Sequence, residues 1–219
     1  MIGCALAATG CTKLSAEPER DSRPFARIVS LDSNQASGEL RQSDWLVRAG
    51  DVDPRAEMRV LREAGESGDG RDDVRWSAAT VPGNLVTQGV VTDGRTPAWY
   101  RKTFVVPANV TAPLALRLDE ISDRDRVYLN GRLFGSTGVW DSPAPQGYDR
   151  HRLYTIPDGM IRKGEVNLLL VQVKGFFPYE SGILRNTTAL GPAEAMWRVH
   201  YLSNFGAVLL LTVYATVAG

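Results

Sequence analysis

Cysteine and histidine are scarce in this 219-residue sequence. The two cysteines, Cys4 and Cys11, both lie in the first eleven residues, so the remainder has no thiol for a disulfide framework, a CxxC metal site or a catalytic cysteine. The sequence has only two histidines, His151 in a predicted loop and His200 just before the final uncharged run, which argues against a histidine metal pair and against a Ser-His-Asp site. We therefore expect no metal, no cofactor and no catalytic residue in this chain.

Neither sign of charge is in excess. The sequence contains 25 Lys and Arg against 25 Asp and Glu, and the two signs are interleaved. Because nucleic-acid binding needs a basic face that neutralises phosphates, we expect no nucleic-acid partner. Hydrophobic residues make up 43% and charged residues 23%, values that are typical of a globular protein, and the length allows one domain of ordinary size.

The N-terminal part is unlike the rest of the chain. Residues 1–16 begin with small apolar side chains and are typical of the end of an export signal. Within them, Ala8-Thr9-Gly10-Cys11 resembles a bacterial lipoprotein cleavage box and makes Cys11 a candidate for lipidation, although Ala8 stands where Leu or Val is usual. An ordinary N-terminal segment is the alternative. Residues 17–43 are mostly polar, and we expect a loosely ordered arm there.

A long uncharged run, residues 201–219, lies at the other end. A membrane-spanning helix needs about 20 mostly apolar residues. Trp197, Arg198 and His200 precede the run and form an aromatic and basic collar of the kind found at membrane interfaces. We predict that residues 193–219 begin a transmembrane helix. A buried helix or strand that closes a soluble core is the alternative.

Charged residues dominate the segment before the regular part of the chain. Between residues 51 and 75, 13 of 25 residues are charged. Such a segment offers little apolar surface to offset the entropy of ordering, so we predict a solvated loop with at most a helical turn near Glu57–Ala64.

From Trp76 onward, short apolar segments alternate with turns rich in Gly and Pro. The predicted strands are Asp44–Arg48, Tyr100–Val106, Leu114–Leu118, Arg126–Leu129, Leu153–Ile156 and Val166–Val173. Asn130-Gly131 predicts a hairpin, because both residues tolerate positive φ, and Val166–Val173 is apolar on both faces, which predicts a central strand. The pattern predicts a mainly β chain, with an antiparallel β-sandwich or jelly roll over residues 44–192.

Four carboxylates cluster between two of these strands: Asp119, Glu120, Asp123 and Asp125. Arginines interrupt them and their spacing does not follow an EF-hand, so we predict a solvated turn rather than a catalytic pair or a calcium loop.

An ordered set of residues in the same region is similar to a known family. The set comprises Trp76, Pro82-Gly83, Trp99-Tyr100-Arg101, Phe104, Pro107, Leu116–Ile121, Val127–Gly131, Gly135, Tyr154, Ile156-Pro157, Gly164, Asn167 and Val171–Val173. It resembles the galactose-binding-like jelly roll, a non-catalytic sugar-binding domain at the start of glycoside hydrolase family 2 enzymes, over roughly Asp44 to Pro192. A similar domain precedes the transmembrane helices of bacterial multi-pass signalling receptors.

We also expect structural roles for the residues that carry this resemblance. Large aromatic side chains such as Trp76, Trp99 and Phe104 can anchor two sheets against each other. Arg101 can pair with Asp119 or Glu120 in the acidic cluster, and Asn167 can hydrogen-bond a loop.

A ligand site would use residues that the fold does not demand. The loop of residues 138–152 and an aromatic loop that contains Phe176 are the candidates, because binding residues concentrate on loops and aromatic faces stack on sugar rings. The candidate ligand-binding residues are Trp140, Tyr148, Arg150, His151, Phe177 and Tyr179. Loop packing and membrane-facing contacts are the alternatives.

Together these features predict an extracytoplasmic ligand-sensing domain of a bacterial membrane signalling protein of the kinase or diguanylate-cyclase type. It would reside in the inner membrane, with residues 17–192 in the periplasm, a carbohydrate or related small molecule as ligand, and a homodimer formed through the receptor. The alternatives are the sugar-binding domain of a truncated family 2 hydrolase and a membrane-anchored carbohydrate-binding module. In the family 2 enzymes the catalytic carboxylates belong to a separate barrel of about 250 residues.

Overall fold

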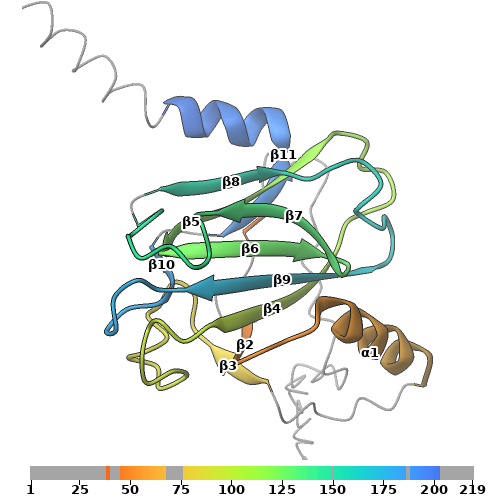
Figure 1. Cartoon of the computed structure of the whole chain (residues 1–219). Helices are drawn as coiled ribbons and strands as arrows, with labels where there is room; N and C mark the ends of the chain where they lie inside the picture. Colours follow the sequence, from red (N-terminus) through yellow and green to blue (C-terminus); the bar gives the residue numbers. More distant parts are fainter. Residues whose placement is uncertain (1–37, 40–44, 68–75, 149, 186–187, 203–219) are drawn as a thin grey trace, which may run out of the picture.

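Two antiparallel sheets form the body of the protein (Figure 1). The computed structural model describes residues 38–39, 45–67, 76–148, 150–185 and 188–202. The six-stranded sheet has the order β3 (Ser77–Ala79), β2 (Trp45–Ala49), β4 (Ala98–Val105), β9 (Val166–Lys174), β6 (Arg124–Leu129) and β7 (Arg132–Thr137). In the five-stranded sheet, β5 (Leu114–Ser122) pairs with β8 (His151–Thr155) along one side, and with β11 (Ala189–Pro192) and β10 (Gly182–Arg185) along the other, while β1 (Gly38–Glu39) pairs with β11. The predicted antiparallel β-sandwich is confirmed.

Apolar side chains from both sheets fill the space between them. Leu114, Leu116 and Leu118 of β5 face the six-stranded sheet, as their alternation predicts. Strand β9 lies between β4 and β6 and is buried on both faces, so the prediction of a central strand is also confirmed. Its side chains divide between the inner core and the outer face of the sheet.

The charged segment contains a helix over residues 54–67, which includes the predicted helical turn and replaces the solvated loop expected there. Helix α1 (Pro54–Ser67) begins after Asp53, whose Oδ1 accepts the backbone N–H of Arg55 at 2.9 Å, and Pro54 occupies the first helical position. Met58 and Leu61 are buried against the outer face of the six-stranded sheet. A narrow apolar stripe on one side is sufficient for a helix that packs, whatever the charge of its other sides.

Trp76 and Trp99 lie under this helix and not between the sheets. Trp99 and Tyr100 are neighbours in β4 and therefore face opposite sides, with Tyr100 in the core between the sheets and Trp99 against α1. Phe104 lies between the sheets as predicted. Arg101 shares the outer face with Trp99, so it pairs with Glu57 of α1 (Nη1–Oε2 3.8 Å) and not with Asp119 or Glu120.

The Asn130-Gly131 turn is the hairpin that the sequence predicts. It joins β6 to β7 with φ of 52° and 81° at the two residues. The Nδ2 of Asn130 donates to Asn167 Oδ1 at 2.9 Å, and Asn167 Nδ2 donates in turn to the carbonyl of Arg162 at 2.8 Å. Asn167 therefore fixes the loop before β9, as expected.

A second helix covers the outer face of the five-stranded sheet. It begins at residue 193, directly after β11, and is described as far as residue 202. Met196 packs with Ala115, Leu153 and Ala189, and the indole Nε1 of Trp197 donates to Thr155 Oγ1 at 2.9 Å. Figure 1 shows this helix and α1 on opposite sides of the sandwich.

Several predictions concern residues outside the described part. These are the leader of residues 1–16 with the lipidation of Cys11, all of the arm except β1, and residues 203–219 of the predicted membrane span. Within the described ranges, no helix is long and apolar enough to cross a membrane.

Candidate ligand-binding surface

The structure brings together two aromatic segments that are far apart in the sequence. Tyr148, from the loop between β7 and β8, meets Phe177, from the loop between β9 and β10, edge to face with ring centroids 5.9 Å apart. Tyr179 stacks on Phe177 at 5.4 Å with an interplanar angle of 17°, and Phe176 meets Phe177 edge to face at 5.0 Å. We refer to Tyr148, Phe176, Phe177 and Tyr179 as the aromatic cluster. Tyr148 and Tyr179 are 40% and 63% exposed, so the cluster presents ring faces and edges to solvent.

Backbone contacts hold the loop between β9 and β10 in place. The N–H of Gly94 donates to the carbonyl of Pro178 at 2.7 Å, and Asn84 Nδ2 donates to the carbonyl of Tyr179 at 2.9 Å. A Cβ on Gly175 would lie 2.1 Å from the carbonyl oxygen of Glu180, so the two backbone segments approach at a distance that only glycine permits. The position of Phe177 and Tyr179 is therefore set by the fold.

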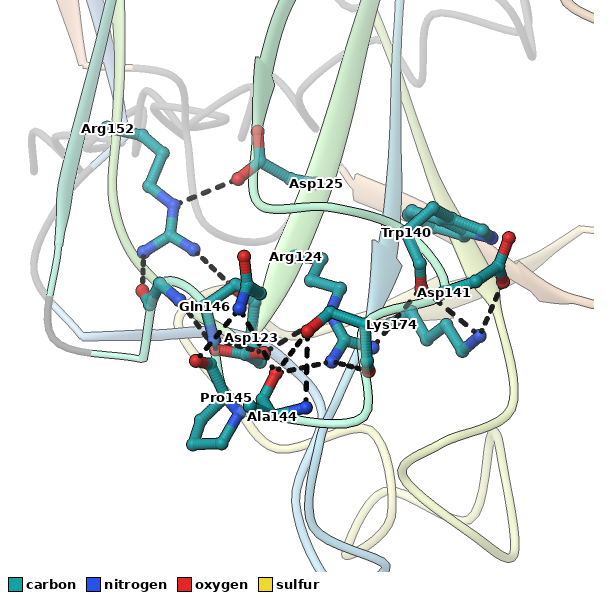
Figure 2. A network of polar contacts seen from close by, with 12 residues as sticks. Asp123, Arg124, Asp125, Trp140, Asp141, Ala144, Pro145, Gln146, Arg152 and Lys174 are labelled. Carbon is teal, nitrogen blue, oxygen red and sulfur yellow. Dashed lines mark hydrogen bonds and ion pairs between the residues drawn. The ribbon is translucent and has the colours of Figure 1, made fainter.

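Arginine and aspartate side chains hold the longer loop between β7 and β8 (Figure 2). Arg124 donates to three carbonyls of this loop, those of Trp140 at 3.2 Å, Ser142 at 2.7 Å and Ala144 at 2.9 Å. The carboxylate of Asp123 accepts the N–H of Gly147 at 2.7 Å. Because these bonds involve charged groups in a buried place, they are stronger than ordinary loop contacts.

Arg152, the second residue of β8, completes this network. Its Nε donates to Asp125 Oδ1 at 2.9 Å, and its Nη atoms donate to the carbonyls of Gly147 and Arg150 at 2.5 Å and of Asp123 at 2.7 Å. Burial raises the pKa of Asp125, and the nearby Arg152 guanidinium opposes that rise. The same carboxylate accepts the Tyr154 hydroxyl at 2.5 Å, and burial followed by the charge of Asp125 raises the pKa of Tyr154.

The acidic cluster is therefore not a solvated turn. Strand β5 runs to Ser122 and β6 begins at Arg124, so Asp123 and Asp125 lie inside the fold, where they are 0% and 1% exposed. Both are bound by arginine or by backbone N–H groups, which is the condition for burying a charge. Their role is to position the loop that carries Tyr148.

Two of the predicted site residues, Trp140 and His151, contact groups outside the aromatic cluster, and a third, Arg150, is exposed close to it in the sequence. Trp140 lies against cations, with the Arg126 guanidinium 4.4 Å and the Lys174 ammonium 5.7 Å from its ring centroid. His151 Nδ1 hydrogen-bonds to Asp119 Oδ1, and its ring lies 6.4 Å from that of His200 in the C-terminal helix. Arg150 follows Tyr148 by two residues, and its side chain is exposed.

Two charged residues beside the cluster were missed by the sequence reasoning. The carboxylate of Glu180 raises the pKa of the Tyr148 phenol, with burial as the second cause, and Arg185 opposes this effect. Oε1 of Glu180 is buried and, within the described residues, accepts no hydrogen bond. Because Glu180 directly follows Tyr179, the sequence could have indicated that Glu180 lies at the site. Nothing in the sequence indicates this for Arg185.

What the surface can do follows from these groups. The stacked pair of Phe177 and Tyr179 offers a flat apolar area, and the partly exposed phenol of Tyr148 offers a hydroxyl that can donate and accept. In the described ranges, no group of three or more His, Cys, Asp or Glu side chains is arranged to hold a metal ion. The surface is therefore suited to binding, through stacking and a few hydrogen bonds.

Solved structures similar to this chain include glycoside hydrolases, whereas no family profile and no curated protein matches it. A glycosyl hydrolase family 2 member from Bacteroides cellulosilyticus matches with a TM-score of 0.51 and 21% identity, over 72% of this chain and 20% of the other. β-Glucuronidase 2 of Bacteroides uniformis, covalently bound to cyclophellitol-6-carboxylate aziridine, gives 0.50 and 20%, over 71% and 18%. A β-glucuronidase from Ruminococcus gnavus in complex with D-glucaro 1,5-lactone gives 0.50 and 17%, over 74% and 30%.

These similarities concern the fold. The sandwich has the architecture of a segment of family 2 glycoside hydrolases, as the sequence resemblance implies. The chain spans less than a third of the length of each of these three enzymes.

Proposed function

We propose that this chain carries a non-catalytic carbohydrate-binding β-sandwich whose ligand site is the aromatic cluster. The observation that carries the proposal is the exposure of Tyr179, stacked on Phe177 in a loop held by backbone contacts. Burying apolar surface stabilises a fold, so exposed, ordered aromatic rings on a loop are typical of binding sites. The apolar face of a pyranose ring matches such a surface.

The structural neighbours support this choice of ligand. Their names describe glycoside hydrolases, and this chain matches less than a third of each, so we infer a non-catalytic accessory part of such an enzyme and not its catalytic part. The whole protein would then be a family 2 glycoside hydrolase, in which the sandwich contributes to binding substrate.

The C-terminal helix favours a second candidate. It follows β11 directly, packs on the five-stranded sheet through Met196 and Trp197, and leads into the uncharged sequence of residues 203–219. The second candidate is a sandwich attached by this segment to a bacterial inner membrane, as the extracytoplasmic sensor of a signalling protein. Carbonate extraction of membranes from cells that express the chain separates the candidates, because a chain with a membrane span stays in the pellet, whereas an accessory enzyme domain is released.

Binding to glycans tests the function common to both candidates. The full chain is screened against a glycan array, and hits are measured by calorimetry in a non-ionic detergent without a sugar head group, which would otherwise compete for the site. We expect the Tyr148→Ala, Tyr179→Ala double variant to bind at least about tenfold more weakly, since each stacked ring contributes about 0.5–1.5 kcal/mol.

Trp140→Ala is the matched control, because it removes an aromatic ring from the same loop but from outside the cluster. It should keep the affinity of the natural chain. Absence of binding to every glycan, or binding that the double variant leaves unchanged, would contradict the proposal.

A further inference from the structure

Two arginines near the aromatic cluster, Arg95 and Arg185, already have carboxylate partners. Nε of Arg185 lies 3.5 Å from Glu120 Oε2. On the adjoining loop, where Gly94 contacts the backbone of Phe177 and Glu180, the side chain of Arg95 binds Asp93 through Nη2 at 2.6 Å and Nε at 3.0 Å. An acidic sugar is normally held by a guanidinium that gives both its donors to the ligand carboxylate. Arg95 gives two such donors to a protein carboxylate instead, and Arg185 is paired with one through Nε.

Glu180 adds negative charge at the edge of the cluster, where its backbone N–H donates to the carbonyl of Phe177 at 3.4 Å. Its carboxylate is the main cause of the raised pKa of Tyr148 and outweighs the opposing effect of Arg185 at that phenol. A negative charge at this place repels an anionic ligand. Oε1 of this carboxylate is buried and accepts no hydrogen bond among the described residues, so nearby protein donors do not neutralise that oxygen.

The stacked rings themselves do not distinguish a charged ligand from a neutral one. Phe177 and Tyr179 offer their faces to the C–H groups of a sugar ring, a contact that depends on apolar area and on ring geometry. A neutral pyranose therefore loses no binding free energy to charge repulsion at this surface. A uronic acid has to place its carboxylate near Glu180 or displace Glu120 from Arg185.

We propose that the aromatic cluster binds an uncharged sugar and discriminates against uronic acids. The inference rests on the proposed carbohydrate-binding function and narrows it to a ligand class. Arg150 is exposed two residues after Tyr148, so its contribution has to be separated in the test.

Matched sugars that differ only at carbon 6 provide the test. The full chain, in the same sugar-free detergent, is titrated with cello- and galacto-oligosaccharides and with the corresponding oligouronides, at low and at high salt. We expect the neutral series to bind at least about tenfold more tightly at low salt, and its affinity to be insensitive to salt because no net charge meets the site. Glu180→Gln should narrow the difference by strengthening uronide binding, and Arg150→Ala should leave the neutral series unchanged.

The outcomes separate this inference from the function on which it rests. Uronides that bind as tightly as neutral sugars, or more tightly, overturn the inference and leave carbohydrate binding standing. If neither series binds, the proposed function fails and the inference fails with it. Thermal unfolding of each variant checks that the chain is folded during the titrations.

Discussion

At the scale of single residues, the ionisation of Tyr148 reports on the charge beside the aromatic cluster. The phenol lies next to Glu180, and its ionisation would place a second negative charge beside the carboxylate. The pKa of Tyr148 is therefore raised above its usual value near 10, with burial as a further cause. Removing the charge of Glu180 removes the main cause.

We predict that Glu180→Gln lowers the pKa of Tyr148 toward the ordinary tyrosine value. The phenol then ionises at a lower pH, because the neutral amide no longer penalises the phenolate. Ultraviolet difference titration at alkaline pH measures the change, and Tyr148→Phe identifies the transition that belongs to this residue. An unchanged titration curve would show that Glu180 does not act on the cluster electrostatically.

At the scale of elements, the loop between β9 and β10 depends on two glycines that have no Cβ. Gly175 and Gly94 allow the backbone carbonyl of Glu180 to approach within 2.1 and 2.3 Å of where a Cβ would stand. Neither a rotamer change nor a small side-chain movement can relieve such a clash, since both partners are backbone.

Gly175→Ala is expected to displace the loop and to weaken glycan binding at least about tenfold while destabilising the protein by about 1–3 kcal/mol. Gly159→Ala is the matched control: nothing lies within 4 Å of the added Cβ, and only its φ of 75° is unfavourable. The control should lose about 1 kcal/mol of stability and no affinity. Urea unfolding and calorimetry measure both quantities, and equal effects of the two changes on binding would contradict the role of the backbone approach.

The elements that the sequence predicts well are those with local signals. Alternation predicts β5, and Asn130-Gly131 predicts the β6–β7 hairpin, because the information lies within a few residues. Helix α1 was missed because few of its residues are apolar, and its apolar stripe becomes meaningful only against Trp76 and Trp99.

The site was harder to predict than the strands. Tyr148 and Phe177 come from separate loops, and nothing local indicates that they meet while Trp140 lies apart. The charges of Asp123 and Asp125 predict a solvated turn, but both residues are buried because arginines and backbone N–H groups from distant segments surround them. A sequence does not display such partners.

At the scale of the whole molecule, strand β8 connects the ligand loop to the C-terminal helix. Arg152 and Tyr154 point to Asp125 of the opposite sheet, and Arg152 also holds the loop that carries Tyr148. The alternate residues face outward, where Leu153 packs with Met196 and Thr155 accepts the indole N–H of Trp197. One strand thus supports both structures from its two faces.

We predict that substitutions at neighbouring positions of β8 act on different parts of the protein. Arg152→Met leaves Asp125 buried without its partner and should cost about 3–5 kcal/mol, with lost hydrogen-exchange protection in residues 138–150. Leu153→Ala should cost about 2–5 kcal/mol and lower protection in residues 193–202. Val199→Ala, at an exposed position of the same helix, should change neither. Loss of protection in both segments with either variant would show that they unfold as one unit.

The position of the C-terminal helix on the five-stranded sheet determines where the chain can be truncated. Ala115, Leu153 and Ala189 form an apolar strip on the outside of the five-stranded sheet, and Met196 covers it. A fragment that ends at Pro192, where the last strand stops, would expose this strip to solvent beside the edge strand β8. Such fragments should self-associate as their concentration rises, whereas fragments that extend through residue 202 retain the cover.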